Sequence, residues 1–231
     1  MIETIVGPSV VSVDTCDDVL DGMLFPEEEA AVAQAVPKRR QEYTTARVCA
    51  RRAMARLGLP AAPVISGLRG EPLWPTGVVG SITHCAGYRG AVLGRLSGVA
   101  TVGIDAEPNA ELTEGVLEAI SLPGERIWIR ELAARAPEVS WDRLLFSAKE
   151  SVYKAWFPLA RCWLDFDDAL ITADPANGTF TARLLIPGPT LHGVAVTGFT
   201  GRWMVRDGLI LTAIVVDAER PDRARPAGLL G

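Results

Sequence analysis

The sequence predicts an α+β protein made of two similar halves in one chain. Three observations support this prediction: β-branched runs near the N-terminus and around residue 80, helical periodicity over residues 110–160, and alternating runs with turn dipeptides up to residue 217. The 231 residues, 48% of them hydrophobic, are enough to bury a core. We expect an N-terminal half over residues 1–108, a C-terminal half over 109–218, and a disordered tail over 219–231, which is rich in Arg, Pro and Gly.

The N-terminal half is expected to begin with a strand over residues 1–14, where Ile and Val recur among small polar residues. Pro26 and the three acids after it predict a helix start, because acidic side chains favour the positive end of the helix dipole. A second helix is predicted from Lys38 to Leu57, ended by Gly58. Beyond a loop rich in proline, three strands are predicted, over residues 78–84, 90–96 and 99–105.

The C-terminal half begins with helical periodicity. Three helices are predicted, over residues 112–120, 124–134 and 141–156, and Pro158 is expected to end the last one. Five runs then predict strands, over residues 167–173, 179–186, 193–200, 202–206 and 209–217. Asn177-Gly178 and Asp207-Gly208 predict tight hairpin turns.

Composition narrows the classes of function. The net charge of −5 argues against a nucleic-acid partner, so an anionic ligand would need a local basic cluster. The four cysteines lack a CxxC pair, and their spacing predicts reduced thiols rather than zinc ligands or disulfides. The N-terminus has no basic region typical of an export signal, and arginines interrupt the apolar runs. We therefore expect a cytoplasmic protein without a membrane span.

Asp105 and Glu107 end an apolar strand at positions i and i+2, so strand alternation puts both carboxylates on one face. Such a pair repels unless a cation lies between the two charges. Magnesium fits if phosphates complete its oxygen shell. The alternative is an exposed strand end with two solvated acids.

Glu150 and Lys154 lie four residues apart on one face of a predicted helix. Aromatic residues surround them in the sequence, which suggests that the helix is buried on most sides: Phe146, Tyr153, Trp156 and Phe157. A partly buried acid–lysine pair indicates a site. An ordinary surface ion pair remains the alternative.

Two further features could bind phosphate. Thr83 and His84 follow a strand among small residues, whereas His192 lies near a turn and looks incidental. Basic residues crowd the second predicted helix and the loop after it: Arg39, Arg40, Arg47, Arg51, Arg52, Arg56 and Arg69. The planar fork of arginine suits phosphate. The alternatives are a structural histidine and a solvated basic face.

These motifs together resemble those of the Sfp/EntD-type 4'-phosphopantetheinyl transferases, in particular their actinobacterial branch. VGIDAE at residues 102–107, followed by FSAKESVYKA at residues 146–155, is similar to the two signatures of that family. PLWP at residues 72–75 and GSITH at residues 80–84 resemble the block before the metal motif.

The resemblance implies a pseudo-twofold α+β fold with coenzyme A between the halves. It implies a magnesium ion held by Asp105, Glu107 and Glu150, among which Asp105 and Glu150 are catalytic together with Lys154. The residues that it implies around coenzyme A fall into two groups, Lys149 and Lys154 on the pyrophosphate and basic or polar residues near the 3'-phosphate: Arg39, Arg40, Arg47, Thr83 and His84. Arg69 stands where related sequences often have a basic residue.

The implied reaction transfers phosphopantetheine from coenzyme A to a serine of an apo acyl or peptidyl carrier protein. The resemblance also implies a monomer that serves secondary metabolism, including siderophore synthesis. Two rival interpretations remain: another magnesium-dependent phosphoryl enzyme such as a nucleotide hydrolase, and a non-catalytic module that binds coenzyme A or a carrier. The missing GxxxxGK[ST] loop argues against the first, and the intact acids and Lys154 argue against the second.

Overall fold

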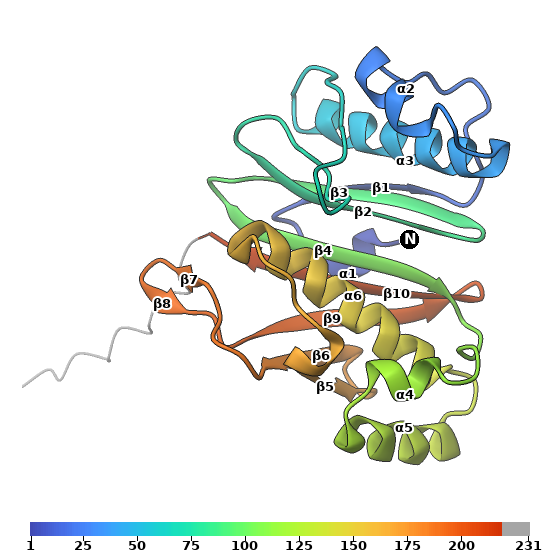
Figure 1. The fold of residues 1–231 in the computed structure, drawn as a ribbon, viewed down its shortest axis with the longest axis vertical. Helices are drawn as coiled ribbons and strands as arrows, with labels where there is room; N and C mark the ends of the chain where they lie inside the picture. Colours follow the sequence, from blue (N-terminus) through green and yellow to red (C-terminus); the bar gives the residue numbers. More distant parts are fainter. Residues whose placement is uncertain (219–231) are drawn as a thin grey trace, which may run out of the picture.

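Two antiparallel sheets lie at the centre of the computed structural model, which describes residues 1–218 (Figure 1). The first belongs to the N-terminal half, and the second joins the last strand of that half to four strands of the C-terminal half. The predicted disordered tail, residues 219–231, lies outside the described residues. The N-terminal sheet has the order β1-β3-β2, with β1 Val11–Thr15, β2 Val78–Cys85 and β3 Tyr88–Arg95. The C-terminal sheet has the order β4-β10-β9-β6-β5, with β4 Val99–Pro108, β5 Ala169–Asp174, β6 Thr179–Leu184, β9 Gly198–Arg206 and β10 Leu209–Asp217.

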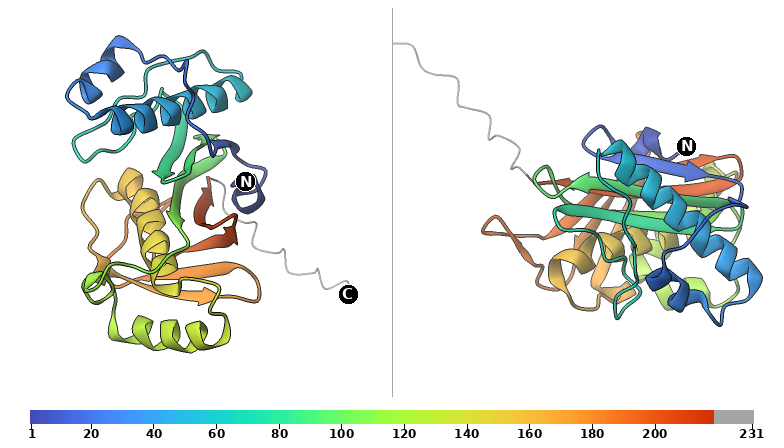
Figure 2. Two further views of the ribbon diagram at one scale, coloured as in Figure 1. Left: turned by 90° about the vertical axis from the view of Figure 1, so that its right-hand side faces the viewer. Right: turned by 90° about the horizontal axis from the view of Figure 1, so that it is seen from above.

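Helices cover both sheets, which confirms the predicted α+β class. The N-terminal half has α1 Glu3–Val6, α2 Pro26–Val32 and α3 Pro37–Arg56. The C-terminal half has α4 Val116–Ile120, α5 Pro123–Arg135, α6 Trp141–Ala160 and the 3-10 turn η1 Phe166–Asp168, together with a small hairpin of β7 Thr190–Leu191 and β8 Val194–Ala195. Figures 1 and 2 show α3 lying across the N-terminal sheet and α6 against the C-terminal sheet. Within residues 1–218, no helix combines the length and apolarity that a bilayer crossing requires.

Each long helix buries one face in its own core. Cys49, Ala53 and Met54 of α3 pack against Ala91 and Leu93 of β3. The apolar face of α6 packs on the C-terminal sheet, and its buried members are Trp141, Leu144, Leu145, Ala148, Val152, Ala155 and Trp156. This helical spacing of buried residues explains why the sequence pattern predicted both helices.

Some predicted elements differ from the structure. Residues 1–14 are not one strand, because Ile5 and Val6 bury themselves from the short helix α1, and Gly7 at φ 76° separates it from β1. Tertiary burial here outweighs the β propensity of the isolated residues. The helix predicted over 112–120 begins only at Val116, after Gly115 at φ 82°.

Pro158 does not end α6, which continues to Ala160. Proline removes a single N–H from the ladder, and Arg161 closes the last turn by donating its N–H to the carbonyl of Phe157. The strands predicted over 193–200 and 202–206 are the short β8 and the continuous β9. Both predicted hairpins form. Asp207 and Gly208, each with positive φ, are the tight turn between β9 and β10, whereas Asn177 and Gly178 end a longer loop between Asp174 of β5 and Thr179 of β6.

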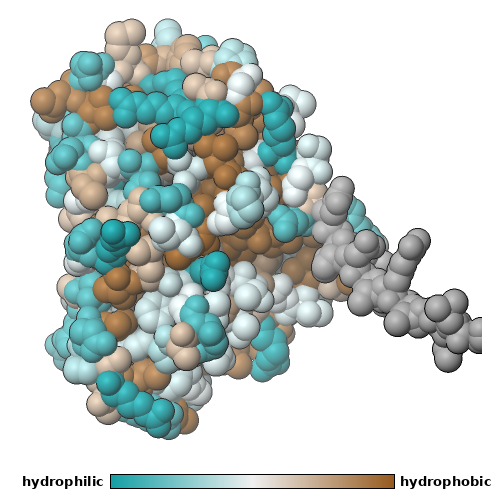
Figure 3. All heavy atoms as spheres, turned by 180° about the vertical axis from the view of Figure 1, so that it is seen from behind, coloured by the Kyte–Doolittle hydropathy of each residue, from teal (hydrophilic) through white to brown (hydrophobic). Residues whose placement is uncertain are grey.

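The halves meet where the edge strands β2 and β4 lie side by side. Two hydroxyls of β2 accept hydrogen bonds from backbone N–H groups of β4: Ser81 from Ile104 at 3.1 Å and Thr83 from Ala106 at 3.0 Å. Seen from behind, hydrophobic side chains gather between the two halves (Figure 3). The junction is therefore partly apolar and partly pinned by side-chain hydroxyls close to the acids at the end of β4.

Gly103 lets α6 approach β4 closely. A Cβ atom at Gly103 would lie 2.0 Å from the carbonyl oxygen of Ser151 and 2.7 Å from the backbone nitrogen of Ala155. Both contact atoms belong to helix backbone and cannot rotate away. The glycine of the VGIDAE motif thus sets the distance between the strand that carries Asp105 and the helix that carries Lys154.

We expect Gly103→Ala to lower the free energy of unfolding by about 1–3 kcal/mol, because α6 must move outward. Carrier modification should fall as well, since Lys154 moves away from Asp105. The matched control is Gly124→Ala, where a Cβ meets nothing within 4 Å. Urea denaturation of both variants checks this, and equal midpoints for Gly103→Ala and the unmodified chain would contradict the packing argument.

Candidate active site

Asp105 of β4 lies at the centre of the candidate site, where it is buried on the side of the strand that faces α6. One carboxylate oxygen, Oδ1, accepts hydrogen bonds from Lys154 Nζ at 2.7 Å and from the Thr83 hydroxyl at 3.3 Å. Lys154 Nζ also donates to the carbonyl of Ile104 at 3.1 Å. The structure therefore brings together Thr83, Asp105 and Lys154, from three elements that are distant in sequence.

The other oxygen of Asp105, Oδ2, is buried and has no hydrogen-bond partner within residues 1–218. A buried carboxylate oxygen normally has a partner, because leaving it unpaired costs about 1–3 kcal/mol or more. An unpaired buried anionic oxygen beside other acids is what a hard cation would satisfy.

Glu107 and Glu150 are the two neighbouring acids. Burial raises the pKa of Glu107, and the charge of Asp105 raises it further. Burial also raises the pKa of Glu150; Lys154 opposes this shift, and Asp105 adds to it. Both carboxylates thus lie where a further positive charge would be favourable, which fits a divalent cation.

The three acids are not yet gathered in the way that a bound metal requires. Among the described residues, no three acidic, His or Cys side chains form a ready metal cluster. Glu107 instead pairs with Arg143 Nη1 at 3.0 Å, and Arg143 also donates to the carbonyls of Ala110 and Glu111. A metal would therefore compete with Arg143 for Glu107 and with Lys154 for Asp105.

His84 and Arg39 form a second part of the site, at the end of β2. Arg39 Nη1 lies 2.6 Å from His84 Nε2, which fits an imidazole that accepts at Nε2. The other ring nitrogen, Nδ1, lies 4.0 Å from Glu42. Burial lowers the pKa of His84, and the positive charge of Arg39 lowers it further. Arg39 thus supplies the positive charge here, and an unprotonated His84 can donate to an anion only through Nδ1.

The structure places three other predicted phosphate contacts elsewhere. Arg40 pairs with Glu29 of α2. Arg47 is buried, donates to the carbonyl of Val64 at 3.1 Å, and stacks over Tyr43. Lys149 points into the C-terminal half and pairs with Glu125 at 2.8 Å. These side chains already have internal partners and do not join Asp105 or His84.

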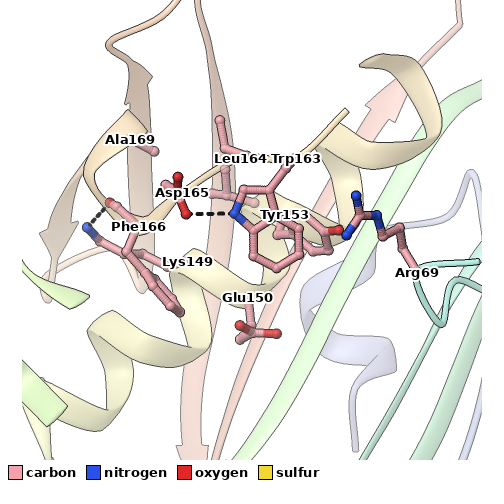
Figure 4. Close-up of a pocket in the computed structure, with 10 residues that line it drawn as sticks. Arg69, Lys149, Glu150, Tyr153, Trp163, Leu164, Asp165, Phe166 and Ala169 are labelled. Carbon is pink, nitrogen blue, oxygen red and sulfur yellow. Dashed lines mark hydrogen bonds between the residues drawn. The ribbon is translucent and has the colours of Figure 1, made fainter. Parts of the chain in front are cut away.

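A cavity of about 230 Å³ adjoins Glu150. Its walls come from α6, the segment after it, and one arginine of the N-terminal half: Arg69, Lys149, Glu150, Val152, Tyr153, Trp163, Leu164, Asp165, Phe166 and Ala169. Figure 4 shows Arg69 reaching toward Tyr153 and Trp163 from the opposite half. The guanidinium of Arg69 lies 5.9 Å from the centre of the Trp163 ring. The cavity is mainly apolar, and Glu150 is the one member of the three acids that lines it.

Comparison with known proteins decides the family. Residues 27–94 match the 4'-phosphopantetheinyl transferase N-terminal domain, and residues 101–197 match the 4'-phosphopantetheinyl transferase superfamily. The chain is 59% identical to the 4'-phosphopantetheinyl transferase Svp of Streptomyces mobaraensis over 89% of this chain and 83% of that protein. It is 54% identical to PptT of Mycobacterium tuberculosis, covering 83% and 86%, and 47% identical to Npt of Nocardia iowensis, covering 93% and 99%.

The chain belongs to the 4'-phosphopantetheinyl transferase superfamily. This confirms the resemblance, and the identity to the three relatives shows that the chain is a phosphopantetheinyl transferase. The matched segments cover the acids of β4, the Glu150 helix and the histidine of β2.

Sequence reasoning missed three residues of the candidate site. Arg143 could have been found, because it precedes Glu150 by two helical turns and so shares its face. Glu125 showed only a helix-start signal behind Pro123, and its contact with Lys149 depends on tertiary packing. Trp163 lies in a segment without periodicity, so its place in the cavity wall had no signal in the sequence.

Proposed function

We propose that the transferase moves phosphopantetheine from coenzyme A to a serine hydroxyl of an apo carrier protein. The serine oxygen forms a bond to the β-phosphorus, and the bond from that phosphorus to adenosine 3',5'-bisphosphate breaks. The observation that supports this proposal is the unpaired, buried Oδ2 of Asp105, whose Oδ1 pairs with Lys154, together with an apolar cavity that Glu150 lines.

Asp105, Glu107 and Glu150 are proposed to hold magnesium. Their fit rests on the unpaired Asp105 oxygen and on the raised pKa values of Glu107 and Glu150. When bound, the ion would neutralise charge on the diphosphate and on the leaving oxygen. Arg143 and Lys154 balance part of the acidic charge when the ion is absent.

The protein's own groups supply positioning and proton transfer. Lys154 puts a positive charge beside the leaving oxygen once the diphosphate is bound. Glu150 accepts the proton of the carrier serine, directly or through one water. Because phosphoryl transfer depends mostly on positioning and electrostatics, the site needs no covalent nucleophile of its own.

The cavity beside Glu150 is proposed to hold the pantetheine arm. Its apolar walls suit the methyl and methylene groups of the arm, and Arg69, Tyr153 and Asp165 offer polar contacts for its two amides. Glu150 lines the cavity, and the charge of Asp105 is near enough to raise the pKa of Glu150. An arm in this cavity would therefore keep the diphosphate near Asp105.

His84 and Arg39 are proposed to bind the 3'-phosphate of coenzyme A. His84→Ala should weaken coenzyme A binding about 10-fold, because a charge-assisted hydrogen bond is lost, and leave dephospho-coenzyme A nearly unaffected. Calorimetry with both ligands checks this. The control is His192→Asn in the exposed β7–β8 turn. Equal losses for both ligands would refute the 3'-phosphate assignment.

The decisive experiment for the reaction mixes the protein with several apo carriers, coenzyme A and magnesium, and follows the intact mass of each carrier. A mass gain of one phosphopantetheine on an acyl or peptidyl carrier supports the proposal. Release of inorganic phosphate with unmodified carriers would favour a nucleotide hydrolase instead. We propose that carriers of secondary metabolism, siderophore synthesis among them, are the substrates of a monomeric enzyme, and the carriers that gain mass show which of them it modifies.

A further inference from the structure

Lys149 precedes Glu150 in α6, yet the two side chains face different parts of the molecule. Glu150 is near Lys154 and Asp105, whereas the Lys149 ammonium is directed at α5 and η1. The side chain of Lys149 is 2% exposed and that of its partner Glu125 is 0% exposed. Side chains of adjacent helix residues point about 100° apart, so Glu150 can face Asp105 while Lys149 faces α5 and η1.

The ion pair between Lys149 and Glu125 is fully built into the fold. Lys149 Nζ pairs with Glu125 Oε2 at 2.8 Å. It also donates to the carbonyl of Phe166 at 2.6 Å, the contact drawn in Figure 4. Glu125 also accepts the N–H groups of Leu122 and Ile171, each at 2.7 Å. The carboxylate thus joins the start of α5, α6 and β5, and the ammonium adds the chain at η1.

This network leaves little of Lys149 for a diphosphate. Burial lowers the pKa of Lys149, and the carboxylate of Glu125 opposes that shift. Turning the ammonium toward Asp105 would leave the fully buried Glu125 with no counter-ion, which is strongly unfavourable. The stem of Lys149 nevertheless lines the cavity, and the carbonyl that it binds belongs to Phe166 in the cavity wall.

We propose that Lys149 and Glu125 are positioning residues that fix the Trp163–Phe166 wall of the cavity and thereby set the affinity for the pantetheine arm. Beyond the backbone bond of Arg161 that closes α6, two side chains of α6 anchor the chain before β5: Trp156 Nε1 donates to the carbonyl of Cys162, and Lys149 donates to that of Phe166. Without the second anchor, the wall residues must be ordered when the ligand binds, which weakens binding. The inference rests on the proposed place of the arm in this cavity.

The test uses Glu125→Gln and two ligands, coenzyme A and 3'-phosphoadenosine 5'-diphosphate. The second ligand keeps both phosphates of the diphosphate and lacks the arm. Calorimetry should show coenzyme A binding weakened about 10-fold and the nucleotide unchanged. If Lys149 instead contacts the diphosphate, freeing it from Glu125 should strengthen or preserve the binding of both ligands, and that result would overturn the inference.

A second variant guards against a folding defect. Lys149→Met combined with Glu125→Leu replaces the pair with apolar side chains and leaves no lone buried charge. We expect it to show the same selective loss for coenzyme A, with a higher KM for coenzyme A and a smaller change in kcat. Equal losses for both ligands in this variant would assign Lys149 to the diphosphate and contradict the inference.

Trp163→Ala separates this inference from the proposed function. It removes the wall itself and should weaken coenzyme A selectively. If Trp163→Ala has no selective effect, the arm does not occupy this cavity, and both proposals about the cavity are wrong. If Trp163→Ala is selective and neither Glu125→Gln nor the double variant is, only the positioning role is wrong.

Discussion

Replacing Asp105 with asparagine is expected to lower kcat/KM for carrier modification by about 10³-fold or more. The substitution keeps the shape of the side chain and removes its charge. Asp105 is the only partner of Lys154 Nζ apart from the Ile104 carbonyl within residues 1–218, and its Oδ2 is the unpaired oxygen of the site. The variant therefore loses both the proposed cation ligand and the group that orients Lys154.

The fold should survive Asp105→Asn, because the backbone of residue 105 stays paired with Thr212 in the β4–β10 ladder and an amide can still accept from Thr83. Asp217→Asn is the matched control, an exposed acid on β10 that should keep full activity. Steady-state kinetics with varied magnesium and a far-UV spectrum test the prediction. Near-normal turnover of a folded Asp105→Asn variant would remove Asp105 from the metal site.

The structure treats the predicted acids and the predicted cations of the candidate site differently. Asp105 and Glu150 could be assigned from two short motifs, and the structure brings them within electrostatic range of each other. What the motifs could not show is the spacing between β4 and α6. That spacing depends on the absence of a side chain at Gly103 and on the backbone of Ser151 and Ala155, forty-eight or more residues away.

The basic residues show why counting charges in a sequence is not enough. Arg47 and Lys149 were expected on phosphates, but Arg47 meets the carbonyl of Val64 and Lys149 meets Glu125. Val64 and Glu125 lie in other segments of the chain, and nothing in the sequence indicated that they would contact these two cations. A cation on a buried helix face needs an internal acceptor, and burial decides which cations remain for a ligand. His84 and Arg39 pair with each other, and because Arg39 is exposed and His84 is half-buried, both remain accessible to a ligand.

Glu150→Gln should reduce kcat by about 10²- to 10⁴-fold, the usual contribution of a general base, and the loss of a metal ligand adds to this. The pH dependence gives the sharper test. Burial raises the pKa of Glu150 above its ordinary 4.5. As a base it must be ionised, so at limiting magnesium the rate of the unmodified enzyme should fall on the acid side from a higher pH than an exposed glutamate would give. Saturating magnesium should move that fall to lower pH, because a bound cation favours the ionised carboxylate.

The stability of the metal-free Glu150→Gln variant should rise, although its activity falls. Because the folded-state pKa is raised, the native state binds more protons than the unfolded state between the two pKa values, and stability declines as pH rises through that window. Glutamine removes this penalty. Without magnesium, Glu150→Gln should therefore melt at a higher temperature than the unmodified protein at neutral pH. The difference should vanish below about pH 4, where the Glu150 carboxyl is neutral in both the folded and the unfolded state.

Glu107 has a raised pKa in both proteins, so its contribution cancels in this comparison. Glu131→Gln, at an exposed position of α5, is the control and should change neither melting nor rate. Melting curves with and without magnesium, from about pH 3 to about pH 8, complete the experiment. Magnesium should raise the melting temperature of the unmodified protein more than that of Glu150→Gln, since the ion offsets the charge that glutamine lacks. An equal magnesium effect in both proteins would mean that Glu150 does not hold the ion, whatever its role in proton transfer.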